Sequence, residues 1–252
     1  HTQHVAINTI TTDDVKDALR KGLDDFKEWP THLVLIALIY PILGLFLIRI
    51  TAGYDILHMI FPLIGGFALI APLAAVGLYE LSRLREQHDD VGWKQAFDIR
   101  HNPGIGAIER LGLTLVGVFF VWLLTAELIY DATYGYETAT SISGFFNQII
   151  STSDGWRLIL VGSGIGFVFA LGVFSTIAIS FPMILDKHVS ASVAVQTSVR
   201  AVIANPVTMA LWGMIIVAAL ILGSIPLFFG LAFVMPVLGH STWHLYRKLI
   251  TH

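Results

Sequence analysis

Cysteine is absent from the 252 residues, and this absence excludes disulfide bonds, thiol nucleophiles and thiolate metal sites. Charge is scarce as well: Asp, Glu, Lys and Arg make up 13% of the chain, and the net charge of -3 provides no basic field for nucleic acid. The sequence contains no phosphate-binding loop, no zinc-protease helix and no nucleophile turn. We therefore expect neither an enzyme nor a nucleic-acid-binding protein.

Apolar residues dominate what is present, at 55% of the chain with a mean hydropathy of +0.73. Several apolar runs reach the roughly 20 residues that cross a bilayer, and strands of alternating polarity are missing. The first 30 residues carry several acids and no apolar core, so we do not expect a cleavable signal peptide there. The sequence predicts an all-α, polytopic membrane helical bundle.

The chain is predicted to form one transmembrane domain over residues 1–252, with three internal repeats at about 12–85, 89–187 and 190–248. Each repeat would give an interfacial helix followed by a helical hairpin, making six transmembrane helices. In the first interfacial helix, residues 12–28, one apolar face is marked by Val15, Leu19, Leu23 and Phe26. In the third, the apolar stripe is Val195, Val199, Val202 and Ile203. The six spans are expected at about 31–50, 55–83, 105–130, 156–185, 207–222 and 226–248.

Two segments at matching positions of the predicted hairpins carry the repeat signal. Pro62-Leu63-x-x-Gly66-x-Ala68-x-x-x-Pro72 recurs as Pro226-Leu227-x-x-Gly230-x-Ala232-x-x-x-Pro236. In the same register, Leu81-x-Arg83 matches Leu245-x-Arg247. The pairs Asn102-Pro103 and Asn205-Pro206 each close an interfacial segment, which supports the same division.

The basic residues predict the orientation of the six spans. With both termini on one side, 13 of the 15 Lys and Arg residues fall on that side, and only Arg49 and Arg157 fall on the other. By the positive-inside rule, both termini and all three interfacial helices are cytoplasmic. The expected location is the inner membrane of a bacterium.

Glu127 has the strongest individual claim to function, because it follows an apolar run late in the third predicted span. At the same predicted depth lie Arg49, Asp55, His58 and Arg157. The group is a candidate intramembrane polar cluster, which is either structural or part of a proton or ion path.

The long connection from Asp131 to Asp154 contains a second candidate. Ile142, Phe145, Phe146, Ile149 and Ile150 have helical spacing and would give a short helix with one apolar face. That face either rests among lipid headgroups or docks another membrane subunit.

His240 and His244 stand four residues apart on the last predicted span, a spacing that can offer two imidazoles to a metal. The sequence supplies no obvious third ligand at that depth except Glu80. We therefore expect an interfacial His244 and a hydrogen-bonded His240, and neither haem nor another cofactor. Membrane lipids are the expected ligands.

Three segments resemble a known family: residues Val15–Phe26, Gly77-Leu78-Tyr79-Glu80-Leu81-Ser82-Arg83, and Pro236–Arg247. They are similar to the bacterial integral membrane family called domain of unknown function 2189, some members of which are labelled cytochrome c oxidase subunit-like. The clustered histidines of an oxidase catalytic subunit are not found in this sequence. The resemblance implies at most an association with respiratory membranes.

The leading hypothesis is a non-catalytic accessory or assembly subunit of an inner-membrane complex, of which a respiratory oxidase is an example. Its partners would be other integral membrane subunits. The alternative is a proton-coupled transporter or small-solute permease, suggested by the internal repeats, the prolines inside spans and Glu127.

Overall fold

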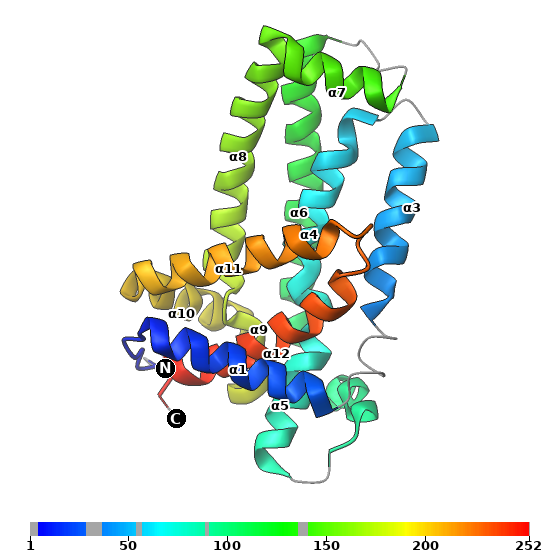
Figure 1. The fold of residues 1–252 in the computed structure, drawn as a ribbon. Helices are drawn as coiled ribbons and strands as arrows, with labels where there is room; N and C mark the ends of the chain where they lie inside the picture. Colours follow the sequence, from blue (N-terminus) through cyan, green and yellow to red (C-terminus); the bar gives the residue numbers. More distant parts are fainter. Residues whose placement is uncertain (1–4, 29–36, 54–56, 89–90, 136–140, 252) are drawn as a thin grey trace. The chain divides into compact units, whose positions relative to one another are not determined.

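The computed structural model describes residues 5–28, 37–53, 57–88, 91–135 and 141–251. In these ranges every regular element is a helix, and Ile7 and Ile250 form one isolated β-bridge. The all-α prediction is confirmed. The elements (Figure 1) are α1 Thr12–Glu28, α3 Ile39–Gly53, η1 Leu57–Met59, α4 Ile60–Ala74, α5 Val76–Gln87, η2 Trp93–His101, α6 Ile105–Tyr134, α7 Ile142–Ser151, α8 Ser153–Ile177, α9 Ser180–Lys187, α10 Ala191–Ala204, α11 Pro206–Ser224 and α12 Leu231–Leu249.

Among the described residues, three helical stretches are long and apolar enough to cross a membrane. They are Ile105–Tyr134, Ser153–Lys187 and Pro206–Ser224, with mean hydropathies of 2.0, 2.2 and 2.2. Shorter apolar stretches lie at Ile39–Arg49, Leu57–Leu69 and Ala191–Ala204. The membrane class predicted from composition therefore agrees with three clearly apolar helices of membrane-spanning length. The start of the first predicted span, residues 31–36, lies outside the described residues.

Two predicted spans are interrupted near prolines. The second divides into α4 and α5 at Ala75, three residues after Pro72, and the fourth divides into α8 and α9 shortly before Pro182. Proline has no N–H for the carbonyl four residues earlier, and for Pro182 that carbonyl belongs to Ala178, at the break between α8 and α9. For Pro72 it belongs to Ala68, inside α4, so this effect does not explain the break at Ala75. At the second break, the N–H of Ile179 donates to Ser198 Oγ at 3.4 Å. In α12, by contrast, Pro236 lies inside an unbroken helix, so the two matching proline segments differ locally.

The chain forms two compact units, and the first comprises His1–Pro41, Pro72–Gly112 and Phe174–His252. In this unit α1 packs along α12 (Figure 1). The approach is close, because a Cβ atom at Gly22 would lie 2.0 Å from Ser241 Oγ. Glycine is therefore required at this crossing.

The buried face of α1 agrees with the predicted one at Val15 and Phe26 but not at Leu23. It consists of Val15, Ala18, Gly22, Asp25 and Phe26, whereas Leu23 is 41% exposed. Helix α10 repeats the pattern, because its buried residues are Ala194, Thr197, Ser198 and Ala201 while Ile203 is 71% exposed. In both helices small side chains are part of the packed face, because they allow close backbone approach. The predicted apolar residues located part of the packed face of α1, whereas none of the four predicted in α10 is among its buried residues.

The two ends of the chain meet in this first unit. The Asn8 N–H donates to the Leu249 carbonyl at 2.8 Å. The Asn205 side chain accepts from the Ile10 N–H at 2.8 Å and donates to the Asn8 carbonyl at 3.0 Å. Asn205, which precedes Pro206 in the sequence, thus fastens the N-terminal segment to the start of α11.

The second unit comprises Ile42–Ala71 and Leu113–Val173. In it, Trp122 Nε1 of α6 donates to the Pro62 carbonyl of α4 at 2.8 Å. A Cβ atom at Gly166 of α8 would lie 3.1 Å from the Trp122 ring. Trp122 therefore contacts both neighbouring helices.

The helix predicted in the connection between α6 and α8 is confirmed as α7, and Ser141 caps it by accepting from the Gly144 N–H. The apolar face proposed for docking is partly buried and partly exposed. Phe145 and Ile149 are buried in a cluster with Leu57 and Tyr130. Phe146 and Ile150 are 46% and 58% exposed. The side chain of Ile142 lies outside the described residues.

Candidate functional site

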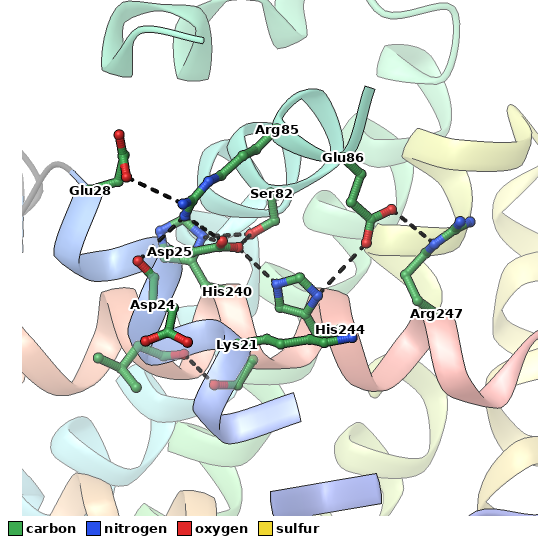
Figure 2. A network of polar contacts seen from close by, with 12 residues as sticks. Lys21, Asp24, Asp25, Glu28, Ser82, Arg85, Glu86, His240, His244 and Arg247 are labelled. Carbon is green, nitrogen blue, oxygen red and sulfur yellow. Dashed lines mark hydrogen bonds and ion pairs between the residues drawn. The ribbon is translucent and has the colours of Figure 1, made fainter. Parts of the chain in front are cut away.

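A buried carboxylate lies where α1, α5 and α12 meet (Figure 2). Asp25 of α1 is 6% exposed. Its Oδ2 atom accepts hydrogen bonds from Ser82 Oγ at 2.6 Å and His244 Nε2 at 2.8 Å, and its Oδ1 atom accepts from Arg85 Nη1 at 2.7 Å. One carboxylate thus joins three helices that are far apart in the sequence.

The hydrogen-bond directions fix the tautomers of the two histidines. Because the Ser82 hydroxyl donates to Asp25, the 2.7 Å contact between Ser82 Oγ and His240 Nδ1 requires Nδ1 to donate. His240 is fully buried, and its Nε2 atom has no hydrogen-bond partner. His244 Nε2 donates to Asp25, so that its Nδ1 faces Glu86 Oε1 at 3.7 Å.

Ion pairs at the rim balance the charges around Asp25 (Figure 2). Arg85 also contacts Glu28 at 3.2 Å, and Arg247 Nε lies 3.0 Å from Glu86 Oε2. Burial opposes ionisation of the Asp25 carboxyl. The hydrogen bonds from His244 and Ser82 outweigh that cost and hold the pKa of Asp25 below its usual value. The site therefore holds an ionised carboxylate that fastens α1 to α5 and α12.

Sequence reasoning did not single out Asp25, Ser82 or Arg85. A signal for Asp25 was present, because it follows Val15, Ala18 and Gly22 at helical spacing on one face of α1. A lone carboxylate on such a face needs a buried partner. Ser82 and Arg85 carry no comparable local signal.

The structure brings together two members of the predicted polar cluster. His58 Nε2 lies 2.8 Å from Glu127 Oε2, and the His58 ring stacks on Tyr130 with ring centroids 4.1 Å apart. Arg157 instead pairs with Asp154 at 3.2 Å, with both side chains largely exposed. Arg49 is exposed near the end of α3, and Asp55 lies outside the described residues.

A cavity of about 590 Å³ lies beside the His58–Glu127 pair, wholly within the second unit. Residues from η1, α4, α6, α7 and α8 line it, among them His58, Trp122, Phe146, Ser163 and Phe169. The His58 side chain is 7% exposed, and its Nδ1 atom has no hydrogen-bond partner.

Over the described ranges, no group of three or more His, Asp or Glu residues is placed to hold a metal ion. His240 and His244 direct their donor atoms at Ser82 and Asp25, which come from two other helices.

Comparison with known proteins identifies one family. The model of a family described as a predicted integral membrane protein, DUF2189, matches residues 60–186. The stretch Gly77–Arg83 falls inside the match, while the other two segments that resemble the family fall outside it. No curated protein and no solved structure matches the chain. The match covers half of the sequence and agrees with the three membrane-length helices, so the chain belongs to the DUF2189 family of predicted integral membrane proteins.

Proposed function

We propose that the protein is a non-catalytic accessory or assembly subunit of a larger complex in a bacterial inner membrane. In the proposed arrangement, six helices span the bilayer as three hairpins and both termini are cytoplasmic. The distribution of 13 of 15 basic residues supports this orientation. The bond between Asn8 and Leu249 supports it independently, because two adjacent chain ends lie on the same side.

The subunit proposal rests on the exposed apolar side chains of the long helices. In the most apolar windows of Ile105–Tyr134, Ser153–Lys187 and Pro206–Ser224, only 17%, 6% and 22% of the residues are buried. Large side chains such as Leu128, Leu160 and Phe167 are 69%, 69% and 67% exposed. Surfaces of this kind contact lipid or the helices of other subunits. The respiratory oxidases are the first class of partner to test, because some members of the family are labelled as oxidase-like.

Native separation of gently solubilised membranes tests the proposal. A photo-crosslinking residue at exposed Phe167 of α8 should join the protein to a recurrent membrane partner, and the protein should migrate with that partner. The same residue placed at Lys16 of α1 is the control, because the Lys16 side chain is 76% exposed and pairs with Asp13 of its own helix. Migration as a single small species, with no partner joined at position 167, would rule out the proposal.

A proton-coupled transporter or small-solute permease is the second candidate. The contact between buried His58 and partly exposed Glu127 beside an apolar cavity favours it, because ionisable residues within membrane spans mark proton paths. Proteoliposomes with an enclosed pH dye would report proton entry on external acidification. Glu127→Gln should abolish that entry, while Asp154→Asn, which alters an exposed ion pair, should leave it intact. Equal proton entry in all three proteins would remove this candidate.

A further inference from the structure

His244 lies between two carboxylates that come from different helices (Figure 2). Its Nε2 atom donates to Asp25 Oδ2 of α1 at 2.8 Å, and its Nδ1 atom faces Glu86 Oε1 of α5 at 3.7 Å. A neutral imidazole that donates through Nε2 carries a lone pair on Nδ1. The uncharged ring therefore satisfies Asp25 but turns an acceptor toward Glu86, which is an acceptor as well.

A proton on Nδ1 changes the contact with Glu86 from two facing acceptors to a donor and an acceptor. The imidazolium ring donates from both nitrogens, so it can bind Asp25 and Glu86 together through charge-assisted hydrogen bonds. The His244 and Glu86 side chains are 10% and 32% exposed. Water at the rim can therefore deliver the proton, and Glu86 has room to move toward the ring.

The charges around His244 favour the protonated ring. The network consists of three carboxylates and two guanidinium groups joined by ion pairs of 2.7–3.2 Å, and its members are Asp25, Glu28, Glu86, Arg85 and Arg247. With neutral histidines the network has a net charge of −1, and one proton brings that charge to zero. Burial opposes a charge on the ring, but the two carboxylates beside it compensate for that cost.

The charged groups on the other parts of the packed helices lie in ion pairs of their own. These pairs are Lys21 with Asp17, Lys27 with Asp24, Arg83 with Glu80, and Lys187 with Asp186. Helix α11 contains no charged residue, and His240 of α12 is fully buried and hydrogen-bonded to Ser82. The unbalanced negative charge therefore lies at the two carboxylates around His244.

We propose that His244 is a proton-operated latch, whose protonated ring fastens α1 to α5 by binding Asp25 and Glu86 at once, whereas its neutral ring binds Asp25 alone. Release of α1 takes Asp25 away from the ring, so the docked arrangement holds the proton more tightly than the released one. By linkage, α1 is held more firmly as the pH falls through the range in which histidines titrate. The latch does not depend on the accessory role proposed above.

Thiol labelling in lipid nanodiscs tests the latch. The chain has no cysteine, and Val15 is 1% exposed on the same buried face of α1 as Asp25. Val15→Cys therefore gives a single thiol, which reacts with a methanethiosulfonate reagent while α1 is released. Lys16→Cys, where the native side chain is 76% exposed, gives the thiol reactivity of the same helix at each pH.

The quantity to compare is the labelling rate of Val15→Cys divided by that of Lys16→Cys. From about pH 7.5 to about pH 5.5 this ratio should fall about fivefold, as expected for one partly exposed charged pair.

Variants of the latch complete the test in the Val15→Cys protein. His244→Gln keeps an N–H donor for Asp25 but cannot gain a proton, so the fivefold fall should vanish. Glu86→Gln removes the second carboxylate and should reduce the fall. The control is His101→Gln, which makes the same substitution at an exposed histidine of η2 and should leave the fall unchanged.

Three results would overturn the inference. One is an equal ratio at both pH values with native His244, a comparison that holds even if His244→Gln does not fold. Another is a fivefold fall that persists in folded His244→Gln, because a different group would then be responsible. The third is a full fivefold fall in Glu86→Gln.

Discussion

Replacing Asp25 with Asn should destabilise the protein strongly, because one carboxylate joins α1 to α5 and α12. Asp25 accepts hydrogen bonds from Ser82, Arg85 and His244 at 2.6–2.8 Å. Breaking a buried ion pair costs about 3–5 kcal/mol. The Asn carbonyl retains one acceptor, so we expect a loss of stability at the lower end of this range, about 3 kcal/mol. At about 2–4 °C per kcal/mol for a chain of this size, the melting temperature should fall by about 6–12 °C.

The assay is thermal unfolding in mild detergent, followed by tryptophan fluorescence. Trp243 is a suitable reporter because it is 1% exposed on α12. The matched control is Asp24→Asn on the same helix, where the carboxylate pairs only at the surface with Lys27 at 3.2 Å. Exposed pairs contribute at most about 1 kcal/mol. Equal shifts for Asp25→Asn and Asp24→Asn would refute the reasoning.

Three further predictions concern the same unit. The pKa of Asp25 is lower in the folded protein than its usual value of 3.8. The ionised carboxylate therefore stabilises the fold fully above pH 3.8, and this stabilisation is lost as the pH falls through the folded-state pKa. The melting temperatures of wild type and Asp25→Asn should converge in acid. Gly22→Val should lower the free energy of unfolding by about 1–3 kcal/mol, because even a Cβ atom would lie 2.0 Å from Ser241 Oγ. The control is Gly162→Ala, where an added Cβ atom has no neighbour within 4 Å and should not lower the melting temperature. Tyr246→Phe removes a 2.6 Å hydrogen bond to Asp186 and should cost about 2 kcal/mol in the same assay.

The helices were largely predictable because their signals are local. Apolar runs and Asn-Pro pairs located α6, α10 and α11 to within a few residues. The interruption of predicted spans before α5 and α9 was harder to foresee. A proline inside a helical pattern, such as Pro72, Pro182 or Pro236, is compatible both with a break and with a continuous helix, and surrounding contacts decide between them.

The candidate sites were less predictable because their partners are distant in the sequence. Asp25 and His244 are 219 residues apart, and no spacing rule connects them. Glu127 was recognised from its position in a span, and His58 was one of several partners at similar predicted depth. The packed face of α1 was predicted in part, at Val15 and Phe26, whereas none of the four residues predicted in α10 is among its buried ones. The apolar pattern could not indicate Gly22, which is required by the close approach of Ser241.

The central claim is that this chain crosses the membrane in paired helices with both ends on the cytoplasmic side. Because the sequence contains no cysteine, single-cysteine variants can be labelled without background. Three exposed residues provide the labelling sites. Asn147 lies in the connection predicted to be outside, Ser192 follows the fourth predicted span, and Thr251 lies at the C-terminus. An impermeant maleimide applied to intact cells should label Asn147→Cys alone and reach the other two only after permeabilisation. Labelling of Ser192→Cys or Thr251→Cys in intact cells would contradict the account.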